Sequence, residues 1–563
     1  MRVDFLGKDQ REFLEVGNYH VGQTLEERFD EIEYCIMSYA PSYGEDMCKF
    51  IVELIEQNIL SLSTPEIANL GKKKVGNTVP LVASCHNVTV GNSIYDIYNA
   101  NLEVAMLSKL GGGVGIDFDL LPQKGTEISQ GFFSNSRIDW IESLVDTSQK
   151  VSQSGVRRGF ATPYLDIESV EFYDLLKKID KKNVEKGVLV DNTIGIKIRD
   201  SFIDKLEAKD KEARKRWLAL MTARQDNGSV YISYIGNMNK NQQVVFKKLG
   251  LEIETSNICT EFTQPNIEGH TPTCILLAYN LNYWDTIFNN PNIIKAGVYL
   301  ADIVCEEYIK GSEGVRGLEK ARKSVIETRN IGLGALGFHE LLQSKGYSFG
   351  GIDSRMLNKE IFSTISKYVY TATRELAHKL GPCKFAKDAG FVQRNASLMM
   401  VAPNKSTSFI CNATSLGIEP VFSNIFTKKL AKKTTTVKNR NLQKLLDSKG
   451  KNTKEVWKSI SENLGSVQHL DFLSEEEKEV FLTFSEISPK DIIDLAADRQ
   501  VYIDMSQSLN LMNRPNYSLK DMHEMHMYAY KKGIKTLYYF YPQAHATIEQ
   551  EGKKWDACIS CAD

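Results

Sequence analysis

The stretch Ser256-Asn257-Ile258-Cys259-Thr260-Glu261 decides how the chain is interpreted, and Cys274 follows it thirteen positions after Glu261. In an extended segment side chains alternate between faces, so Asn257, Cys259 and Glu261 are predicted to project together. A carboxylate can accept a proton from a substrate hydroxyl, an amide can orient that hydroxyl, and a thiol can exchange a hydrogen or act as a nucleophile. The spacing is consistent with catalysis, although the residues alone leave open a buried, inert Cys259 beside a solvated Glu261.

Asn257-x-Cys259-x-Glu261, with Thr273-Cys274 after it, resembles the active-site finger loop of ribonucleotide reductase large subunits. Further matches follow along the chain in the family order, from Thr64 to Cys561. The resemblance implies an α/β fold: a ten-stranded α/β barrel of two five-stranded parallel halves that are antiparallel to each other. The Cys259 loop is then expected to pass through the centre of the barrel.

Composition indicates an ordinary soluble globular protein. Of 563 residues, 42% are hydrophobic and 25% charged, and 69 basic against 71 acidic residues leave a net charge of −2. These values argue against a general nucleic-acid or membrane binder. There is no apolar stretch long enough to span a bilayer and no signal peptide, so a cytoplasmic protein is predicted, in a bacterial cell or a virus-infected host cell. The ten scattered cysteines favour reduced or catalytically cycling thiols.

Three regions are expected along the chain. Residues 1–62 form an N-terminal helical region, in which the segment 24–29 opens with a capping-box pattern. By resemblance, this region is too short to hold the family's ATP-cone. Residues 63–540 form the barrel with helical insertions, among which the lysine-rich and then helical segment 427–490 has no assigned role. Residues 541–563 form a flexible C-terminal redox tail.

The resemblance implies a substrate site assembled from several segments. The apolar run Pro80–Val88 is predicted to be the first buried strand, and its thiol, Cys85, matches the family's first redox cysteine. The turn 403–407 precedes a helix and offers hydroxyls and backbone N–H groups to an anion, as in the family's loop for substrate phosphates. The substrate-binding residues implied in this way are Thr64, Ser84, Gly113, Pro403, Asn404, Lys405, Ser406 and Thr407.

A specificity site for a nucleoside triphosphate effector is also implied by the family. It corresponds to Asn92, Ser93 and Ile94, together with Arg157 in a glycine-flanked loop that resembles the family's second specificity loop. Asn92 stands where the family usually has Asp, and Pro122 where it often has Arg. Whether specificity control operates in this chain is therefore left open.

Tyr538-Tyr539 discriminates between classes of the family. Adjacent tyrosines are common in strands. In class I reductases such a pair completes a radical path from a separate small subunit, whereas class II enzymes generate their radical with adenosylcobalamin and do not need it. The terminal Cys558-x-x-Cys561 is better suited to a dithiol shuttle than to zinc, because one pair supplies half of a zinc site.

The resemblance thus implies a class I catalytic subunit that reduces ribonucleoside diphosphates. Its radical would come from a metal-containing small subunit, with no covalently bound cofactor and no metal in this chain. Mg²⁺ would accompany the nucleotide, thioredoxin or glutaredoxin would recharge the tail, and the chain would form a homodimer. In the implied reaction Cys259 becomes a thiyl radical, Glu261 and Asn257 handle the 3′-hydroxyl, and Cys85 with Cys274 supplies two electrons.

Three alternatives to a class I reductase make different demands on the sequence. A class II reductase would respond to adenosylcobalamin. A noncatalytic paralogue is expected to have lost at least one of Cys85, Cys259, Glu261 or Cys274, all of which are present. A nicotinamide-dependent dehydrogenase could use the G-x-G-x-x-G motif at 332–337, but a helix is predicted before it where a dinucleotide site needs a strand. Close-packed glycine backbone in the barrel is therefore predicted there.

Overall fold

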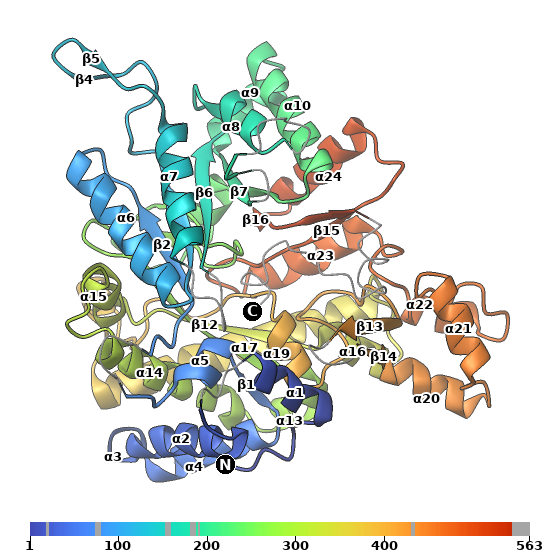
Figure 1. The fold of residues 1–563 in the computed structure, drawn as a ribbon. Coiled ribbons are helices and arrows are strands. Elements are labelled where there is room, and N and C mark those ends of the chain that lie inside the picture. The colour runs from blue at the N-terminus through green and yellow to red at the C-terminus, as the bar shows by residue number, and fades with distance from the viewer. Residues whose placement is uncertain are drawn as a thin grey trace.

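The computed structural model describes residues 1–17, 22–73, 80–151, 159–180, 187–189, 192–429 and 434–542. The N-terminal helices α1 (Lys8–Val16), α2 (Leu25–Ser38), α3 (Ala40–Tyr43) and α4 (Glu45–Glu56) lie together at one end of the molecule (Figure 1). The predicted capping box is confirmed at α2, where the Thr24 side chain accepts from Glu27 N and the Glu27 carboxylate accepts from Thr24 N. No helix in the described ranges is long and apolar enough to cross a membrane.

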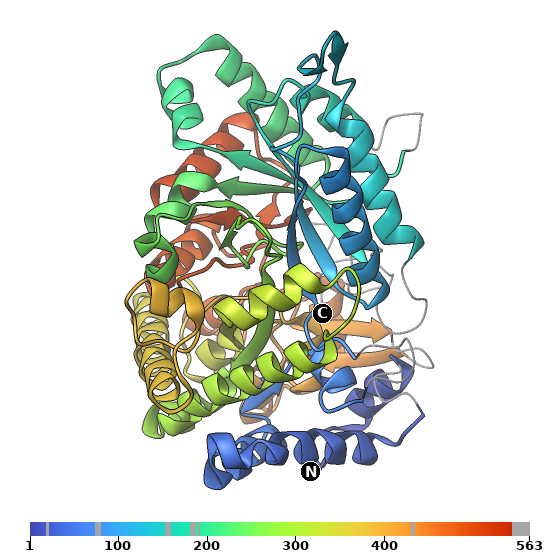
Figure 2. The same cartoon turned by 90° about the vertical axis from the view of Figure 1, so that its left-hand side faces the viewer.

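One half of the barrel is a parallel sheet of five neighbouring strands. The strands are rich in β-branched residues and buried on both faces, as expected where a parallel sheet is covered by other elements. Helices α6 (Ile94–Lys109) and α7 (Arg137–Lys150) lie along its outer side (Figure 2). The strands are β2 (Cys85–Thr89), β3 (Gly113–Asp117), β6 (Phe160–Asp166), β7 (Ile194–Ile198) and β8 (Val230–Tyr234).

The second half is also parallel and begins with β11 (Thr273–Asn280) beside β12 (Ile331–Leu336). Isolated parallel β-bridges add the next two segments: Leu333 of β12 pairs with Met399, and Val401 pairs with Gln507. The last two segments pair through β15 (Leu511–Asn513) and β17 (Phe540–Pro542), and β16 (Thr536–Leu537) lies on the final segment.

Two antiparallel contacts join the halves. β11 pairs with β2, and β16 pairs with β8. Five segments on each side, closed at both seams, confirm the expected ten-stranded barrel of two antiparallel halves. The short β1 (Leu60–Leu62) adds an antiparallel neighbour to β11.

The segment 80–88 departs from its predicted form. The strand covers only the second part of the predicted run, since β2 starts at the thiol and runs from Cys85 to Thr89. Pro80 has no N–H to donate, and the ladder with β3 begins at Cys85 opposite Gly113. It is also not the first strand in the chain, because β1 precedes it.

The glycine motif at 332–337 belongs to the barrel wall, as predicted. Its first two glycines lie inside β12, which follows helix α15 (Glu319–Thr328), rather than in a turn after a strand. A Cβ added to Gly332 would lie 2.4 Å from the Met400 side chain, and one added to Gly334 would lie 2.5 Å from the Met400 carbonyl oxygen. Close packing of neighbouring backbone therefore accounts for these glycines.

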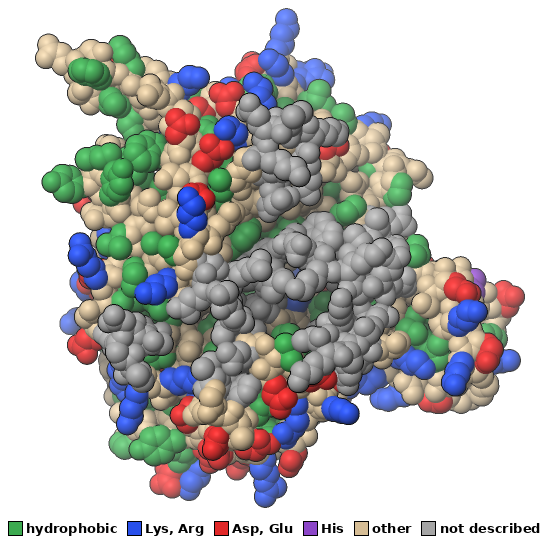
Figure 3. Space-filling view, in the orientation of Figure 1, with side chains coloured by type: hydrophobic (Ala, Val, Ile, Leu, Met, Phe, Trp, Pro, Cys, Tyr) green, Lys and Arg blue, Asp and Glu red, His purple; other side chains and the backbone are tan. Residues whose placement is uncertain are grey.

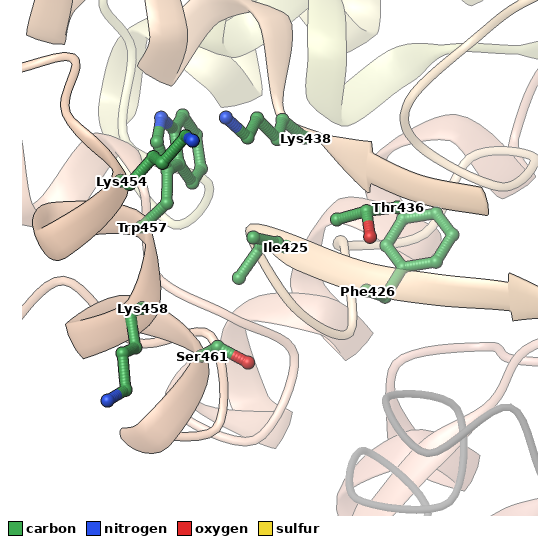
Figure 4. A pocket seen from close by; sticks show the side chains of 8 residues that line it. All are labelled: Ile425, Phe426, Thr436, Lys438, Lys454, Trp457, Lys458 and Ser461. Carbon is green, nitrogen blue, oxygen red and sulfur yellow. The ribbon is translucent and has the colours of Figure 1, made fainter. Parts of the chain in front are cut away.

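A satellite unit projects from the barrel between residues 425 and 481 (Figure 1). It contains β13 (Ile425–Lys429), β14 (Thr434–Lys438), α20 (Arg440–Ser448), α21 (Lys454–Glu462) and α22 (Glu475–Val480), and has its own apolar cluster around Trp457. An open hollow of about 340 Å³ lies between the hairpin and α21 (Figure 4). The Lys438 ammonium lies 4.8 Å from the Trp457 ring centroid. None of the predicted site residues lines this hollow.

The remaining elements cover the barrel or connect its strands. A two-stranded hairpin, β4 with β5, extends away from the body beside α6 (Figure 1). The other helices are α5 (Thr64–Asn69), α8 (Phe172–Lys178), α9 (Asp200–Glu207), α10 (Lys211–Asp226), α11 (Ile235–Lys240), α12 (Val244–Lys248), η1 (Leu281–Tyr283), α13 (Trp284–Asn289), α14 (Asn292–Gly311), α16 (Phe338–Ser344), α17 (Ile352–Leu380), α18 (Lys384–Asp388), α19 (Lys405–Ile410), α23 (Pro489–Gln500) and α24 (Leu519–Lys531). The other strands are β4 (Glu127–Ser129), β5 (Phe132–Phe133), β9 (Ile253–Thr255) and β10 (Gln264–Pro265).

Candidate active site

The Cys259 segment is a buried loop held between β9 and β10, which pair antiparallel at its base. It is a turn and not the extended segment predicted from alternation, because Thr260 takes a left-handed backbone with φ of 71°. Tertiary hydrogen bonds hold this conformation. Ser508 Oγ donates to the Cys259 carbonyl oxygen at 2.6 Å, and Thr536 Oγ1 donates to the Thr260 carbonyl oxygen at 3.0 Å.

The loop lies directly against the glycines of β3. A Cβ on Gly115 would lie 1.9 Å from the Ser256 carbonyl oxygen, and a Cβ on Gly113 would lie 2.0 Å from the Ile258 side chain. Tyr164 Oη also donates to the Asn257 carbonyl oxygen at 2.6 Å. The loop can therefore approach the sheet this closely only because β3 has glycine at these two positions.

Asn257 and Glu261 meet across the turn. Asn257 Nδ2 donates to Glu261 Oε1 at 2.8 Å, and the Ser508 hydroxyl shares its one hydrogen between Glu261 Oε2, at 2.7 Å, and the Cys259 carbonyl oxygen. Burial raises the pKa of Glu261, while the hydrogen bonds from Ser508 and Asn257 oppose that rise. A carboxylate held in this way can exchange a proton with a bound hydroxyl while remaining oriented.

Cys85 and Cys274 face each other across one of the barrel seams. They are Cα partners in the antiparallel pairing of β2 with β11. Antiparallel partners have Cα atoms roughly 4.5–5.5 Å apart, which lies within the range that a disulfide spans. Both are thiols in this structure, and burial raises the pKa of Cys274 well above its ordinary value. The pair shares a buried cluster with Phe262, Met400 and Met505.

The predicted tyrosine pair leads to the loop cysteine. Tyr538 Oη donates to Cys259 Sγ at 3.4 Å, and the Tyr538 and Tyr539 ring centroids are 4.4 Å apart. Both rings are buried, at 2% and 4% exposure, and burial raises both phenol pKa values. The phenols are therefore neutral O–H groups at neutral pH, and one of them touches the thiol.

The predicted substrate residues occupy several sides of the barrel. Thr64 begins α5, and its buried Oγ1 has no hydrogen-bond partner among the described residues. Ser84 Oγ lies 3.9 Å from Cys85 Sγ, whereas Gly113 packs against Ile258.

In the segment 403–407, Asn404 is left-handed with φ of 51° and α19 begins at Lys405. Pro403 and Lys405 are half-buried, and Ser406 and Thr407 are buried.

The predicted effector residues are less enclosed. Asn92 and Ile94 are exposed, and Ser93 caps α6 by accepting from Asp96 N. The Ser93 hydroxyl also donates to the Asp96 carboxylate at 2.6 Å, so this group already has partners within the helix end. Arg157, Cys558 and Cys561 lie outside the described residues.

Sequence reasoning missed three residues of this site: Ser508, Tyr231 and Tyr541. Ser508 lies in the stretch 498–510 that resembles the end of the family's barrel, yet no spacing predicts its contact with Glu261. The Tyr231 ring packs against both Tyr538 and Tyr539, with centroids 4.7 and 5.2 Å away. Tyr541 lies two positions after Tyr539, and in a strand this spacing places both side chains on one face.

Comparisons with known proteins agree with this architecture. The family description "Ribonucleotide reductase, barrel domain" matches residues 83–213, 205–393 and 386–540. The ribonucleoside-diphosphate reductase large subunit of Invertebrate iridescent virus 3 is 28% identical over 90% of this chain and 89% of its own. The corresponding Caenorhabditis elegans subunit is 28% identical over 88% and 71%. The solved class Id ribonucleotide reductase alpha subunit of Actinobacillus ureae matches with a TM-score of 0.87 at 31% identity, over 96% of this chain and 97% of its own.

A closed α/β barrel with one thiol on a buried loop and a pair of thiols at its seam has the groups that a thiol-based oxidoreductase needs. The family match covers most of the chain, and the solved relative matches nearly all of it. The chain belongs to the ribonucleotide reductase family and is a large, catalytic subunit of the class I kind.

Proposed function

We propose that this chain reduces ribonucleoside diphosphates to 2′-deoxyribonucleoside diphosphates, with Cys259 as the residue that becomes a thiyl radical. The observation that carries the proposal is the contact of Tyr538 with the Cys259 thiol, with Tyr539 directly behind it. A hydrogen atom can pass from the thiol to an oxidised phenol over this contact. An oxidant on a separate, metal-containing small subunit would supply the oxidising equivalent.

The chemistry on the ribose is assigned to groups around the loop. The Cys259 thiyl takes the 3′-hydrogen, and Glu261 takes the 3′-hydroxyl proton while Asn257 orients that hydroxyl. The 2′-hydroxyl leaves as water with a proton from Cys85. Cys85 and Cys274 supply two electrons by forming a disulfide, which their position as strand partners supports. Cys274 supplies the hydrogen that replaces the 2′-hydroxyl, and Glu261 returns its proton to the 3′-oxygen. The 3′-hydrogen then returns from Cys259, which regenerates the thiyl radical.

Substrate binding is assigned to Thr64, Ser84, Gly113 and the segment 403–407. The buried, unpartnered Thr64 Oγ1 supports this, because a buried hydroxyl without a hydrogen bond is costly unless a ligand satisfies it. Mg²⁺ would accompany the nucleotide phosphates. A nucleoside triphosphate effector is assigned to the region of Asn92, Ser93, Ile94 and Arg157.

Reduction of the Cys85–Cys274 disulfide is assigned to Cys558 and Cys561, which thioredoxin or glutaredoxin would recharge. A homodimer is proposed through α6 and the β4–β5 hairpin. Hydrophobic side chains gather over these elements on the face seen in Figure 3. The exposed ones are Ile94, Tyr95 and Tyr98 on α6 and Ile128, Phe132 and Phe133 on the hairpin.

Deoxynucleotide formation from CDP with dithiothreitol tests the proposal. The chain is compared alone, with adenosylcobalamin, and with a class I small subunit from the same source. Activity only with the small subunit is expected. Activity with cobalamin alone would favour the class II alternative, and inactivity throughout would favour a noncatalytic paralogue.

Cys259→Ser is expected to abolish turnover, because a serine O–H is too strong a bond to replace the thiol in hydrogen exchange. Binding of CDP should remain, since the change leaves the loop and its neighbours in place. Equilibrium binding and product formation are measured on the same preparation. A Cys259→Ser protein that still makes deoxynucleotide would contradict the central role of this thiol.

A further inference from the structure

The ring contacts of Tyr538 and Tyr539 continue to one further tyrosine, Tyr541. Tyr541 lies in β17, two positions after Tyr539, and is only 2% exposed. The Tyr539 and Tyr541 rings are stacked, with centroids 5.2 Å apart and planes inclined by 18°. Contacts therefore run in order from Tyr541 to Tyr539, to Tyr538 and to the Cys259 thiol.

Tyr231 is the other aromatic candidate, but it occupies a different place. Its ring contacts both Tyr538 and Tyr539, so it lies beside the pair. Tyr231 does not lengthen the series away from Cys259. Tyr541 extends it by one phenol on the side of Tyr539.

The Tyr541 phenol also has a cation beside it. Lys405 Nζ donates to Tyr541 Oη at 3.4 Å and lies 5.4 Å from the centre of the ring. Lys405 is the first residue of α19, in the segment assigned to the substrate phosphates. One ammonium group thus connects that segment with the outermost phenol of the series.

We propose that Tyr541 is a third redox-active tyrosine of the radical route and that Lys405 connects it to the substrate-phosphate segment. The inference rests on the proposed class I function. A phenoxyl-type radical on the small subunit takes a hydrogen atom from the Tyr541 O–H. The Tyr541 phenoxyl then takes one from Tyr539, Tyr539 from Tyr538, and Tyr538 from Cys259. At each step one O–H or S–H bond breaks, one O–H bond forms, and no net charge moves.

The ammonium explains why the electron and proton of Tyr541 leave together. Loss of the electron alone would create a phenol cation beside the Lys405 charge, which like-charge repulsion disfavours. A phosphate bound at the segment 403–407 would compete for the Lys405 ammonium and so change its hydrogen bond to the phenol oxygen from which the hydrogen atom leaves. Oxidation of Tyr541 is therefore expected to depend on the presence of a phosphorylated substrate.

The decisive experiment places 3-aminotyrosine, which traps a radical, at position 541 of the full chain. The chain is mixed with its small subunit and CDP and examined by electron paramagnetic resonance. An aminotyrosyl signal is expected at 541, and a weaker one is expected with cytidine in place of CDP. The matched control carries 3-aminotyrosine at Tyr530, a half-buried tyrosine whose hydroxyl donates to Asp200, and should give no signal.

Tyr541→Phe provides a second measurement, because it keeps the stacked ring and removes only the hydroxyl. Its kcat is expected to fall at least about tenfold with the KM for CDP within about twofold, the pattern of a lost transfer step. Tyr530→Phe should retain wild-type kcat. Suppose that the wild-type chain is active with its small subunit. An unchanged kcat in Tyr541→Phe, or the absence of a signal at 541, then overturns this inference but not the proposed function. A wild-type chain active only with cobalamin overturns the proposed function and this inference with it.

Discussion

Glu261 illustrates how single hydrogen bonds set the chemistry of the site. The carboxylate is 1% exposed, and burial alone would favour its protonated form. Ser508 and Asn257 each donate to one of its oxygens, which favours the ionised form. The balance between burial and these two donors decides whether Glu261 can accept the proton of a substrate hydroxyl.

Ser508→Ala is expected to move the acidic limb of the kcat/KM profile to higher pH. Removal of a donor to the carboxylate destabilises its ionised form, so the pKa of Glu261 rises further, and ionised Glu261 is lost as pH falls through that higher value. A hydrogen bond to a charged group contributes about 1.5–3 kcal/mol, which corresponds to roughly one to two pH units. The pH dependence of CDP reduction measures the shift.

Ser506→Ala is the control for that measurement. The Ser506 hydroxyl bonds to Thr536 Oγ1, and only its backbone N–H contacts Glu261, at the carbonyl oxygen. The profile of Ser506→Ala should match the wild type. An unshifted profile in Ser508→Ala would contradict Glu261 as the proton acceptor.

At the scale of elements, the approach of the finger loop to β3 determines where the thiol lies. Gly115 faces the Ser256 carbonyl oxygen and the Asn257 Cα, and neither backbone group can turn aside as the end of a long side chain can. The loop itself is bonded to Ser508 and Thr536 on the opposite half of the barrel. It is therefore fixed from both sides.

Gly115→Ala is expected to displace the loop and to reduce kcat by roughly a hundredfold or more, since a displacement of about 1 Å can cost that much. Overpacking should also lower the free energy of unfolding by about 1–3 kcal/mol. Turnover and thermal unfolding are measured together. Gly187→Ala is the control, because its Cβ would meet only the Glu142 carboxylate at 3.3 Å. Wild-type turnover in Gly115→Ala would refute the proposed loop constraint.

At the scale of the molecule, closure of the barrel brings together the proposed redox pair. Cys85 and Cys274 belong to different halves and become neighbours only where β2 meets β11. Their cluster is buried, so a reductant must enter the barrel to reach the disulfide they would form. This requirement supports the assignment of a dithiol on a terminal segment to the task.

Cys558→Ser with Cys561→Ser is expected to stop multiple turnovers with thioredoxin as reductant while sparing the first. The reason is that Cys85 and Cys274 carry two electrons before any recharging is needed. Product per active site, followed by rapid quench, distinguishes one equivalent from many. Sustained turnover of this variant with thioredoxin would contradict the shuttle.

The proposed homodimer is also a property of the whole molecule. The side chains of Tyr95 and Tyr98 are 80% and 61% exposed, and Phe132 on the hairpin is 69% exposed. Tyr95→Glu with Tyr98→Glu should shift sedimentation from dimer to monomer, because charge would be buried at the interface. Tyr34→Glu, at a site on α2 that is 78% exposed, should leave the dimer intact. A wild-type chain that sediments as a monomer would contradict the proposal.

Sequence and tertiary structure contributed different parts of this site. The resemblance of short motifs to the family predicted roles for Asn257, Cys259, Glu261 and the pair Tyr538-Tyr539, and the family order of the motifs predicted the ten-stranded barrel. Local alternation failed at the finger loop, because hydrogen bonds from distant Ser508 and Thr536 hold a left-handed turn there. The resemblance implied that Cys85 and Cys274 act together, and the folded barrel places them opposite each other. Only the tertiary structure shows Ser508 on Glu261 and Lys405 on Tyr541. These contacts join segments more than a hundred residues apart, so tertiary packing decides them rather than any pattern within one segment.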